Sequence, residues 1–207
     1  MGLTFGFGKR KEPLKISYLD PDSGPMMTRY LAKHLKTVSH DREIIFFCIG
    51  TDRSTGDALG PLVGTNLCKQ NLPRERIFGT LDHPVHAINL QEQLEKANSL
   101  YENPFIVAVD ACLGQLPNVG CIQIAEGPLK PGAAVHKELP PVGHMHITGI
   151  VNVSGFMEYF VLQNTRLSQV IHMAEHISES IIQALIQCGR FRSIAASPFM
   201  DADSQSL

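Results

Sequence analysis

The sequence has no tryptophan and almost no net charge, because 18 lysines and arginines balance 20 aspartates and glutamates to leave −2. Such a chain has no overall field that would draw it to nucleic acid or to an anionic membrane. It also lacks a basic stripe with interleaved aromatic residues, so we expect no direct contact with nucleic acid. No apolar run approaches the roughly 20 residues that span a bilayer, and residues 1–15 lack the apolar core of a signal peptide. These features predict a cytoplasmic protein that does not contact a membrane.

Several motifs of common enzyme classes are also missing. There is no GxSxG of serine hydrolases, no HExxH of zinc proteases, and no GxxxxGK[ST] or GxGxxG of nucleotide-binding proteins. The five cysteines are widely spaced and form no CxxC pair, which predicts free thiols in a reducing compartment rather than disulfides or a zinc site. They are Cys48, Cys68, Cys112, Cys121 and Cys188.

The length of 207 residues and a hydrophobic content of 43% predict one domain with a full-size core. Residues 1–24 are polar and rich in glycine, lysine and proline, which indicates a flexible N-terminal arm. Residues 191–207 resemble a flexible C-terminal tail. The folded domain is therefore expected over residues 25–190.

Strand-like and helix-like segments alternate within this domain. Two apolar β-rich runs, 43–50 and 104–114, have the composition of strands that are buried on both faces. Further expectations are a short strand at 76–81, an edge strand at 119–127, a long loop at 127–148, a helix from Ile150, and helices at 26–38, 58–70, 89–101 and 165–189. This alternation predicts an α/β domain, a three-layer αβα sandwich around a mainly parallel sheet.

Two aspartates follow the two buried runs. Asp57 ends the polar loop after the first strand, and Asp110 ends the segment "FIVAVD" of the second. Parallel strands direct their carboxyl ends to one edge of the sheet, where ligands of such folds bind, so we expect the two carboxylates to meet there. Asp57 opens a helix, which favours its ionised form, whereas the five apolar residues before Asp110 predict a raised pKa.

Such a pair has two chemical interpretations. Two close carboxyls with different pKa values can act as general base and general acid on a water that attacks an amide. Two carboxylates and a histidine can instead hold a divalent metal ion. The candidate histidines are His136, His144 and His146. No firm metal site or cofactor follows from the sequence, and both interpretations stay open.

The residues around the acids are candidates for binding substrate. Thr51, Asp52, Arg53 and Ser54 would shape the loop before Asp57, and Arg53 could hold a substrate carboxylate. Thr148 and Asn152 could bind a substrate backbone from the opposite side. The partner expected from this set is a protein or peptide substrate, and the composition is compatible with a homo-oligomer.

Three blocks together resemble a known family: "IGTDRSTGDALGPLVG", "AVDACLG" and "KELPPVGHMHITGIVNVSGFMEY". Over roughly residues 26–188 the chain is similar to the YyaC-type sporulation proteins (the DUF1256 family), relatives of the spore germination protease and of hydrogenase-maturation endopeptidases. The resemblance implies a phosphorylase/hydrolase-like (HybD-like) fold. It also implies an atypical aspartic peptidase in which Asp57 and Asp110 match the two acids of the germination protease.

The same resemblance leaves three functions in competition. One is a sporulation-associated aspartic-type peptidase in the spore or forespore, with small acid-soluble spore proteins among its substrates. The second is a metal-dependent endopeptidase, like the hydrogenase-maturation enzymes, with a histidine beside Asp57 and Asp110. The third is a catalytically inactive relative that uses the crevice to bind peptides.

Overall fold

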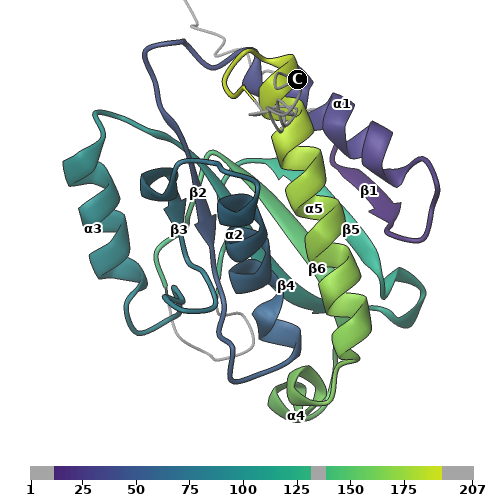
Figure 1. Ribbon diagram of the computed structural model, residues 1–207. Coiled ribbons are helices and arrows are strands. Elements are labelled where there is room, and N and C mark those ends of the chain that lie inside the picture. Colours follow the sequence, from purple (N-terminus) through teal and green to yellow (C-terminus); the bar gives the residue numbers. More distant parts are fainter. Residues whose placement is uncertain (1–11, 132–138, 193–207) are drawn as a thin grey trace, which may run out of the picture.

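The computed structural model describes residues 12–131 and 139–192, and these form a six-stranded sheet between two layers of helices. The order of strands across the sheet is β1-β5-β6-β4-β2-β3 (Figure 1). Strands β3, β2, β4 and β6 are parallel, β5 runs antiparallel to β6, and β1 runs antiparallel to β5. The α/β architecture and the mainly parallel sheet expected from the sequence are therefore confirmed.

The bounds of the elements are as follows. The strands are β1 (Leu14–Ser17), β2 (Ile44–Cys48), β3 (Ile77–Phe78), β4 (Phe105–Gly114), β5 (Cys121–Glu126) and β6 (Met145–Val153). The α-helices are α1 (Ser23–Leu35), α2 (Leu59–Lys69), α3 (Leu90–Leu100), α4 (Glu158–Gln163) and α5 (Leu167–Gln187). Three short 3₁₀ turns complete the described chain: η1 (Gly56–Ala58), η2 (Arg74–Arg76) and η3 (Leu116–Asn118).

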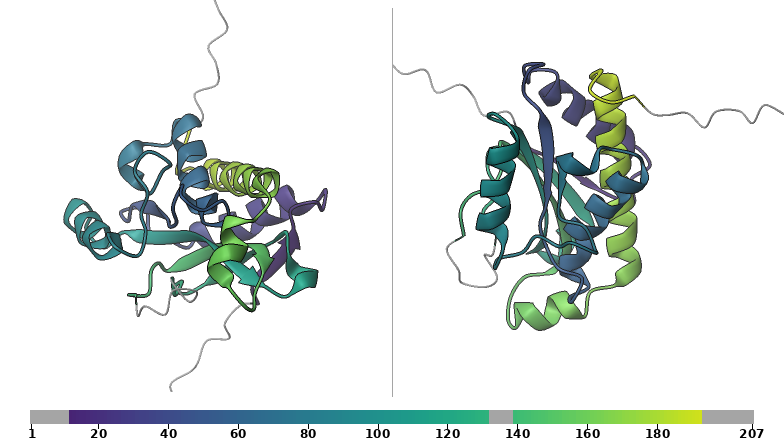
Figure 2. Two further views of the ribbon diagram at one scale, coloured as in Figure 1. Left: turned by 90° about the horizontal axis from the view of Figure 1, so that it is seen from below. Right: turned by 60° about the vertical axis from the view of Figure 1, so that its left-hand side comes forward.

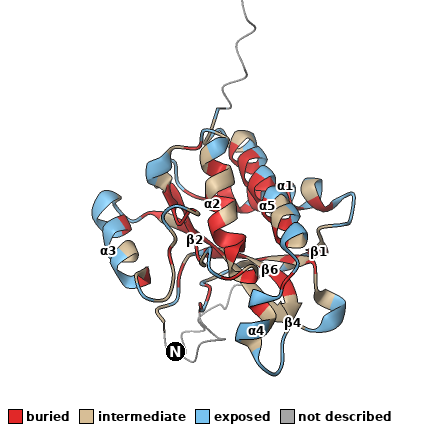
Figure 3. Ribbon diagram, turned by 60° about the horizontal axis from the view of Figure 1, so that its bottom comes forward, coloured by how far each residue is buried: buried red, intermediate tan, exposed pale blue. Residues whose placement is uncertain are grey.

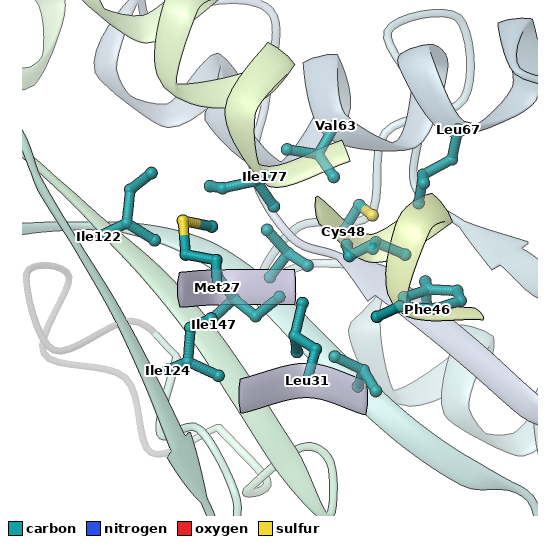
Figure 4. Packing of buried hydrophobic residues seen from close by; sticks show 14 of the residues in the cluster. Met27, Leu31, Phe46, Cys48, Val63, Leu67, Ile122, Ile124, Ile147 and Ile177 are labelled. Carbon is teal, nitrogen blue, oxygen red and sulfur yellow. The ribbon is translucent and has the colours of Figure 1, made fainter. Parts of the chain in front are cut away.

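One face of the sheet is closed by helices α1, α2 and α5, and we call it the closed face. Figure 2 shows these helices together on one side of the sheet and α3 alone on the other. Every second residue of the strands enters the closed-face core, including Phe46, Val109, Ile122 and Ile147. Met27, Val63 and Ile177 meet them from the three helices (Figure 4). Burial of each such side chain contributes about 1.5–3 kcal/mol to stability.

The opposite face is covered more sparsely. Helix α3 places Leu90 and Ala97 on Phe47 of β2 and Ala108 of β4. Leu129 and Val142 form an isolated bridge and join this second cluster. On this side, the residues of β5 and β6 belong to neither apolar cluster. The alternate residues of the same strands point to the other side and enter the closed-face core. We call this side the open face.

Three expectations from the sequence were wrong. The expected helix from Ile150 is part of strand β6, because a strand between β4 and β5 gains a ladder on both edges and its β-branched residues favour it. Residues 14–17, assigned to the N-terminal arm, form β1 and place Ile16 in the core. Strand β5 is not an edge strand, since β1 pairs with its outer side.

The four expected helices are confirmed within a few residues, and Pro61 lies in the first turn of α2 as its missing N–H requires. All five cysteines are free thiols; Cys48 is buried and the others are half-buried. Within the described ranges, no helix is long and apolar enough to cross a membrane.

Candidate functional site

The loop that carries Asp57 is folded back on itself at the end of β2. The Ile49 N–H donates a hydrogen bond to Val109 O at 2.7 Å, which extends the pairing with β4 by one residue. The Thr51 N–H then donates to Asp57 O at 3.1 Å and closes the loop. Gly50 has φ +144°, and a Cβ there would lie 2.0 Å from Asp57 O. Only glycine therefore fits at this position.

Close packing of helix α2 holds Asp57 at the carboxyl edge of the sheet. A Cβ on Gly60 would lie 2.0 Å from Ile49 O, and one on Gly64 would lie 1.9 Å from Gly79 O. These two glycines let the helix backbone touch the strand ends, so η1, which contains Asp57, packs against β4. Asp57 is not the capping residue of α2, which starts at Leu59 without a side-chain cap.

Asp110 lies within β4 and pairs in register with Thr148 of β6. The strand continues to Gly114, in agreement with the expected run 104–114, because β6 supplies partners to its end. One carboxylate oxygen of Asp110, Oδ1, accepts the N–H of Ala111 at 2.8 Å. Because the preceding residue, Val109, faces the closed-face core, the Asp110 side chain lies on the open face, at the edge of the sheet that η1 contacts.

The two carboxyls interact and differ in acidity. The pKa of Asp110 is raised to about 8, chiefly by burial; the Ala111 hydrogen bond opposes this rise and the charge of Asp57 adds to it. Part of the Asp110 surface remains exposed, but its carboxyl is surrounded by protein. Burial also raises the pKa of Asp57, although to a smaller extent. With a pKa of about 8, the Asp110 carboxyl is mostly protonated at neutral pH.

The expectation that the start of a helix keeps Asp57 ionised, with a low pKa, was wrong. Burial raises the pKa of this carboxyl instead. The nearby Ser54 hydroxyl opposes this rise. Ser54 is buried, and its Oγ lies beside the carboxyl without completing a full hydrogen bond. Among the predicted loop residues Thr51, Asp52, Arg53 and Ser54, it is Ser54 whose side chain acts on the pKa of Asp57.

Cys112 and Thr148 complete the surroundings of Asp110. Burial and the charge of Asp110 raise the pKa of the Cys112 thiol to about 11, although a hydrogen bond with the Thr148 side chain lowers it. At neutral pH the thiol stays protonated, so Cys112 is not an activated nucleophile. Thr148, predicted to face the acids, does so through the register of β4 and β6.

The structure does not bring the described candidate histidines onto the acid pair. His144 precedes β6 at the opposite end, where its Nδ1 accepts the Ile106 N–H at 3.1 Å and its Nε2 lies 3.2 Å from Arg42 Nη2. His146 is paired with Ala108, and its Nδ1 is 2.9 Å from Gly127 O. His136 lies outside the described residues. Over 12–131 and 139–192, no three metal-ligating side chains are grouped.

The remaining predicted residues have separate positions. Thr51 is half-buried and its Oγ1 accepts the Arg53 N–H at 3.3 Å, whereas Asp52 and Arg53 are exposed. The Asn152 amide donates to Val161 O and Thr165 Oγ1, both at 3.2 Å. That amide ties helix α4 to β6.

Helix α4 forms a rim beside the acid site that sequence reasoning missed. A Cβ on Gly56 would lie 2.7 Å from Leu162, so this glycine lets α4 rest on η1, next to Asp57. The same segment exposes Phe156 (90%), Tyr159 (63%) and Phe160 (53%) (Figure 3). The cluster of aromatic residues after Gly155 was the signal in the sequence for this rim. In the structure they form an exposed apolar patch, and such patches often mark binding sites.

A cavity of about 500 Å³ lies away from the acids, between α1 and α5. Its walls include Arg29, His176 and Glu179, and neither Asp57 nor Asp110 lines it. The acids instead lie at the carboxyl edge of the sheet, where η1 packs against β4. A neutral carboxyl beside an ionised one can donate and accept a proton across a single water, as in general acid–base catalysis.

Three comparisons place the chain among known proteins. The model of a family described as "Protein of unknown function (DUF1256)" matches residues 15–180. The "Uncharacterized protein YyaC" of Bacillus subtilis (strain 168) is 51% identical over 166 residues, which is 80% of each chain. A solved structure, the [NiFe] hydrogenase maturation protease HycI of Thermococcus kodakarensis KOD1, is similar with 18% identity and a TM-score of 0.42, over 72% of this chain and 98% of that one.

Proposed function

The chain belongs to the DUF1256 family, and from its acid pair we propose that it is a peptidase that hydrolyses peptide bonds with Asp57 and Asp110. The observation that carries this proposal is that the charge of Asp57 acts on the buried carboxyl of Asp110 where η1 packs against β4. The pKa of Asp110 is raised to about 8, first by burial and also by the charge of Asp57, and burial raises the pKa of Asp57 as well. Such a pair is the arrangement that acid–base hydrolysis of an amide requires.

In the proposed reaction Asp57 is the general base and the neutral Asp110 is the general acid. Asp57 accepts a proton from water while the water oxygen forms a bond to the carbonyl carbon of the substrate. Asp110 then donates its proton to the amide nitrogen as the C–N bond breaks, which yields a carboxylic acid and an amine. A proton passes from Asp57 to Asp110 to restore the starting state. The balance is one water consumed for each peptide bond cleaved.

The loop before Asp57 supplies groups for binding substrate in this proposal. Arg53 is exposed and makes no ion pair within the described residues, so its guanidinium is available for a substrate carboxylate. Thr51 and Asp52 stand beside it on the same loop. Thr148 contributes a hydroxyl on the other side of Asp110.

We extend the proposal to a setting and a first group of substrates. The relative in Bacillus subtilis and the resemblance to sporulation proteins support action in the cytoplasm of a forespore or spore. Small acid-soluble spore proteins are accordingly the first proteins to test. A library of proteome-derived peptides, with new amino termini identified by mass spectrometry, would detect cleavage of other sequences.

The test compares wild type with Asp57→Asn and Asp110→Asn. Each substitution is expected to lower kcat/KM by about 10²–10⁴-fold, the usual contribution of a general acid or base. Wild-type activity should also decline above about pH 8, where Asp110 loses its proton. Asp22→Asn makes the same chemical change at an exposed position before α1 and serves as the control.

The proposal fails if wild type cleaves nothing in either substrate set while it remains folded. It also fails if cleavage survives both substitutions. Retained binding of peptides without cleavage would identify the chain as a binding protein instead.

A further inference from the structure

Four polar residues form a row across the open face, starting at the acid site. Asp110 of β4 pairs with Thr148 of β6, Thr148 pairs with Gln123 of β5, and Gln123 pairs with Lys15 of β1. Paired residues in neighbouring strands present their side chains on the same face. We call Asp110, Thr148, Gln123 and Lys15 the polar row.

Burial confirms which way the polar row faces. Each member has a sequence neighbour in the closed-face core, namely Val109, Ile147, Ile122 and Ile16. Because successive residues of a strand alternate between faces, the polar row faces away from that core. Asp110, Thr148 and Gln123 are half-buried and Lys15 is exposed.

Helix α3 leaves the far end of this face uncovered. Its apolar residues pack on strands β2, β3 and β4. Within the described ranges, neither β5 nor β1 has an apolar residue packed against α3. A polypeptide could therefore lie across the strands from Asp110 to β1.

The side chains beyond Thr148 have free binding capacity. The Gln123 amide makes no hydrogen bond to any residue that the structure describes, so its donor and acceptor are both available. The Lys15 ammonium donates to Asn118 Oδ1 at 3.0 Å and forms no ion pair with the described part of the chain. Asn118 belongs to η3, which follows β4 at the carboxyl edge, so the Lys15 side chain leans toward the edge that carries the acid pair.

We propose that the polar row is the substrate-binding track of the peptidase, and that Lys15 selects an acidic side chain in the polypeptide. This proposal rests on the proposed function, because it places the scissile bond at Asp57 and Asp110. Gln123 would hydrogen-bond the substrate backbone between the acid pair and Lys15. The Lys15 ammonium would pair with the carboxylate of an Asp or Glu.

The spacing of the strands sets the position of that acidic residue. Neighbouring strands lie about 4.8 Å apart, so the three steps from β4 to β1 amount to about 14 Å. An extended polypeptide covers about 3.3 Å per residue. The acidic side chain should therefore stand about four residues from the cleaved bond, on one side of it.

The first experiment profiles cleavage of a proteome-derived peptide library by wild type, Lys15→Glu and Lys33→Glu. Lys33 is an exposed lysine of α1, and its substitution makes the same charge change away from the polar row. Wild type and Lys33→Glu should favour Asp or Glu about four residues from the cut by about two- to fivefold in kcat/KM over Gln, the range of an exposed ion pair. Lys15→Glu should favour Lys or Arg there instead.

Two further readouts separate the track from a general effect on folding. Gln123→Ala should raise KM for Glu and Gln peptides alike and leave their ratio unchanged. The preference for Glu should weaken at 0.5 M salt, because an exposed ion pair is screened. If cleavage proceeds and Lys15→Glu keeps the wild-type preference, the track proposal is overturned while the proposed function stands.

A binding measurement covers the case in which the proposed function fails. Asp57→Asn protein is titrated with nonapeptide pools that carry Glu or Gln at one fixed position, and the amide NMR signals of Gln123 and Thr148 are followed. Shifts that favour Glu and vanish in the Lys15→Glu background support the track without hydrolysis. Equal shifts with Glu and Gln, or no shifts, overturn the track independently of cleavage.

Discussion

The two faces of β4, β5 and β6 carry opposite chemistry on the same short segments of chain. On the closed face Val109, Ile122 and Ile147 are fully buried beneath α1, α2 and α5. On the open face their neighbours Asp110, Gln123 and Thr148 are polar and half-buried. Both faces share the same backbone pairing. They differ only in the side chains that point to each face and in the helices that cover them.

This contrast separates stability from chemistry. The closed face supplies most of the apolar burial that holds the sheet flat against its helices. The open face has few apolar contacts over β5 and β1, so it can keep a carboxyl with a raised pKa at its edge without unfolding the sheet. Substitutions on the two faces should accordingly have different consequences.

The largest expected effect on stability comes from adjacent residues of β6. Ile147→Ala should lower the free energy of unfolding by about 2–5 kcal/mol, because it leaves a cavity in the closed-face core. Thr148→Ala, one residue later on the open face, should cost less than about 1 kcal/mol. Urea denaturation of both variants checks this contrast, and equal losses would contradict the division between the faces.

The next effect has the opposite sign and depends on pH. The pKa of Asp110 is about 8 in the folded chain and about 3.9 when unfolded, so the folded state holds this proton more tightly. The stability that this tighter proton binding contributes is fully present below pH 4 and is lost as the pH rises to about 8. Asp110→Asn should therefore gain about 1–3 kcal/mol of stability over wild type at pH 8 relative to pH 4.

Urea denaturation at pH 4, 6 and 8 measures the gain from Asp110→Asn, with Asp22→Asn as the exposed control. A stabilised variant that has lost activity would show that the acid site costs stability. A variant that is less stable than wild type at every pH would instead mean that the Asp110 carboxylate is needed for folding.

The sequence predicted those parts of the fold in which local pattern and burial agree. The runs 43–50 and 104–114 are continuous and apolar, and both became central parallel strands. The stripe of α5 from Leu167 to Gln187 was equally clear, because its apolar residues repeat at the helical period. The positions of Asp57 and Asp110 at one edge followed from the direction of parallel strands alone.

The failures occurred where tertiary pairing overrides local pattern. Met145–Val153 contains one glycine and three polar residues, so the sequence did not decide between a helix and a strand. The pairing with β4 and β5 decides for a strand. β1 has only four residues and depends on β5 for every ladder hydrogen bond. The separation of His144 from the acids could not be predicted, because it depends on the register between β4 and β6.

The smallest expected effect concerns His144, at the other end of the open face. Met145 pairs with Val107, three residues before Asp110, so His144 stands more than about 10 Å from the acid along the strands. Its ring stacks on Phe105 with centroids 5.1 Å apart, and it accepts the Ile106 N–H. These contacts join His144 to the start of β4, away from Asp57 and Asp110.

His144→Ala should consequently lower the free energy of unfolding by about 1 kcal/mol, the usual net value of one hydrogen bond, and leave kcat/KM unchanged. Urea denaturation and a peptide cleavage assay, each repeated with EDTA, test both parts. Burial and the positive Arg42 lower the pKa of His144, so its ring stays neutral and the stability loss should be constant above pH 7. A large loss of activity, or inhibition by EDTA that this substitution abolishes, would instead favour a metal-dependent site and would break the separation between the two ends of the open face.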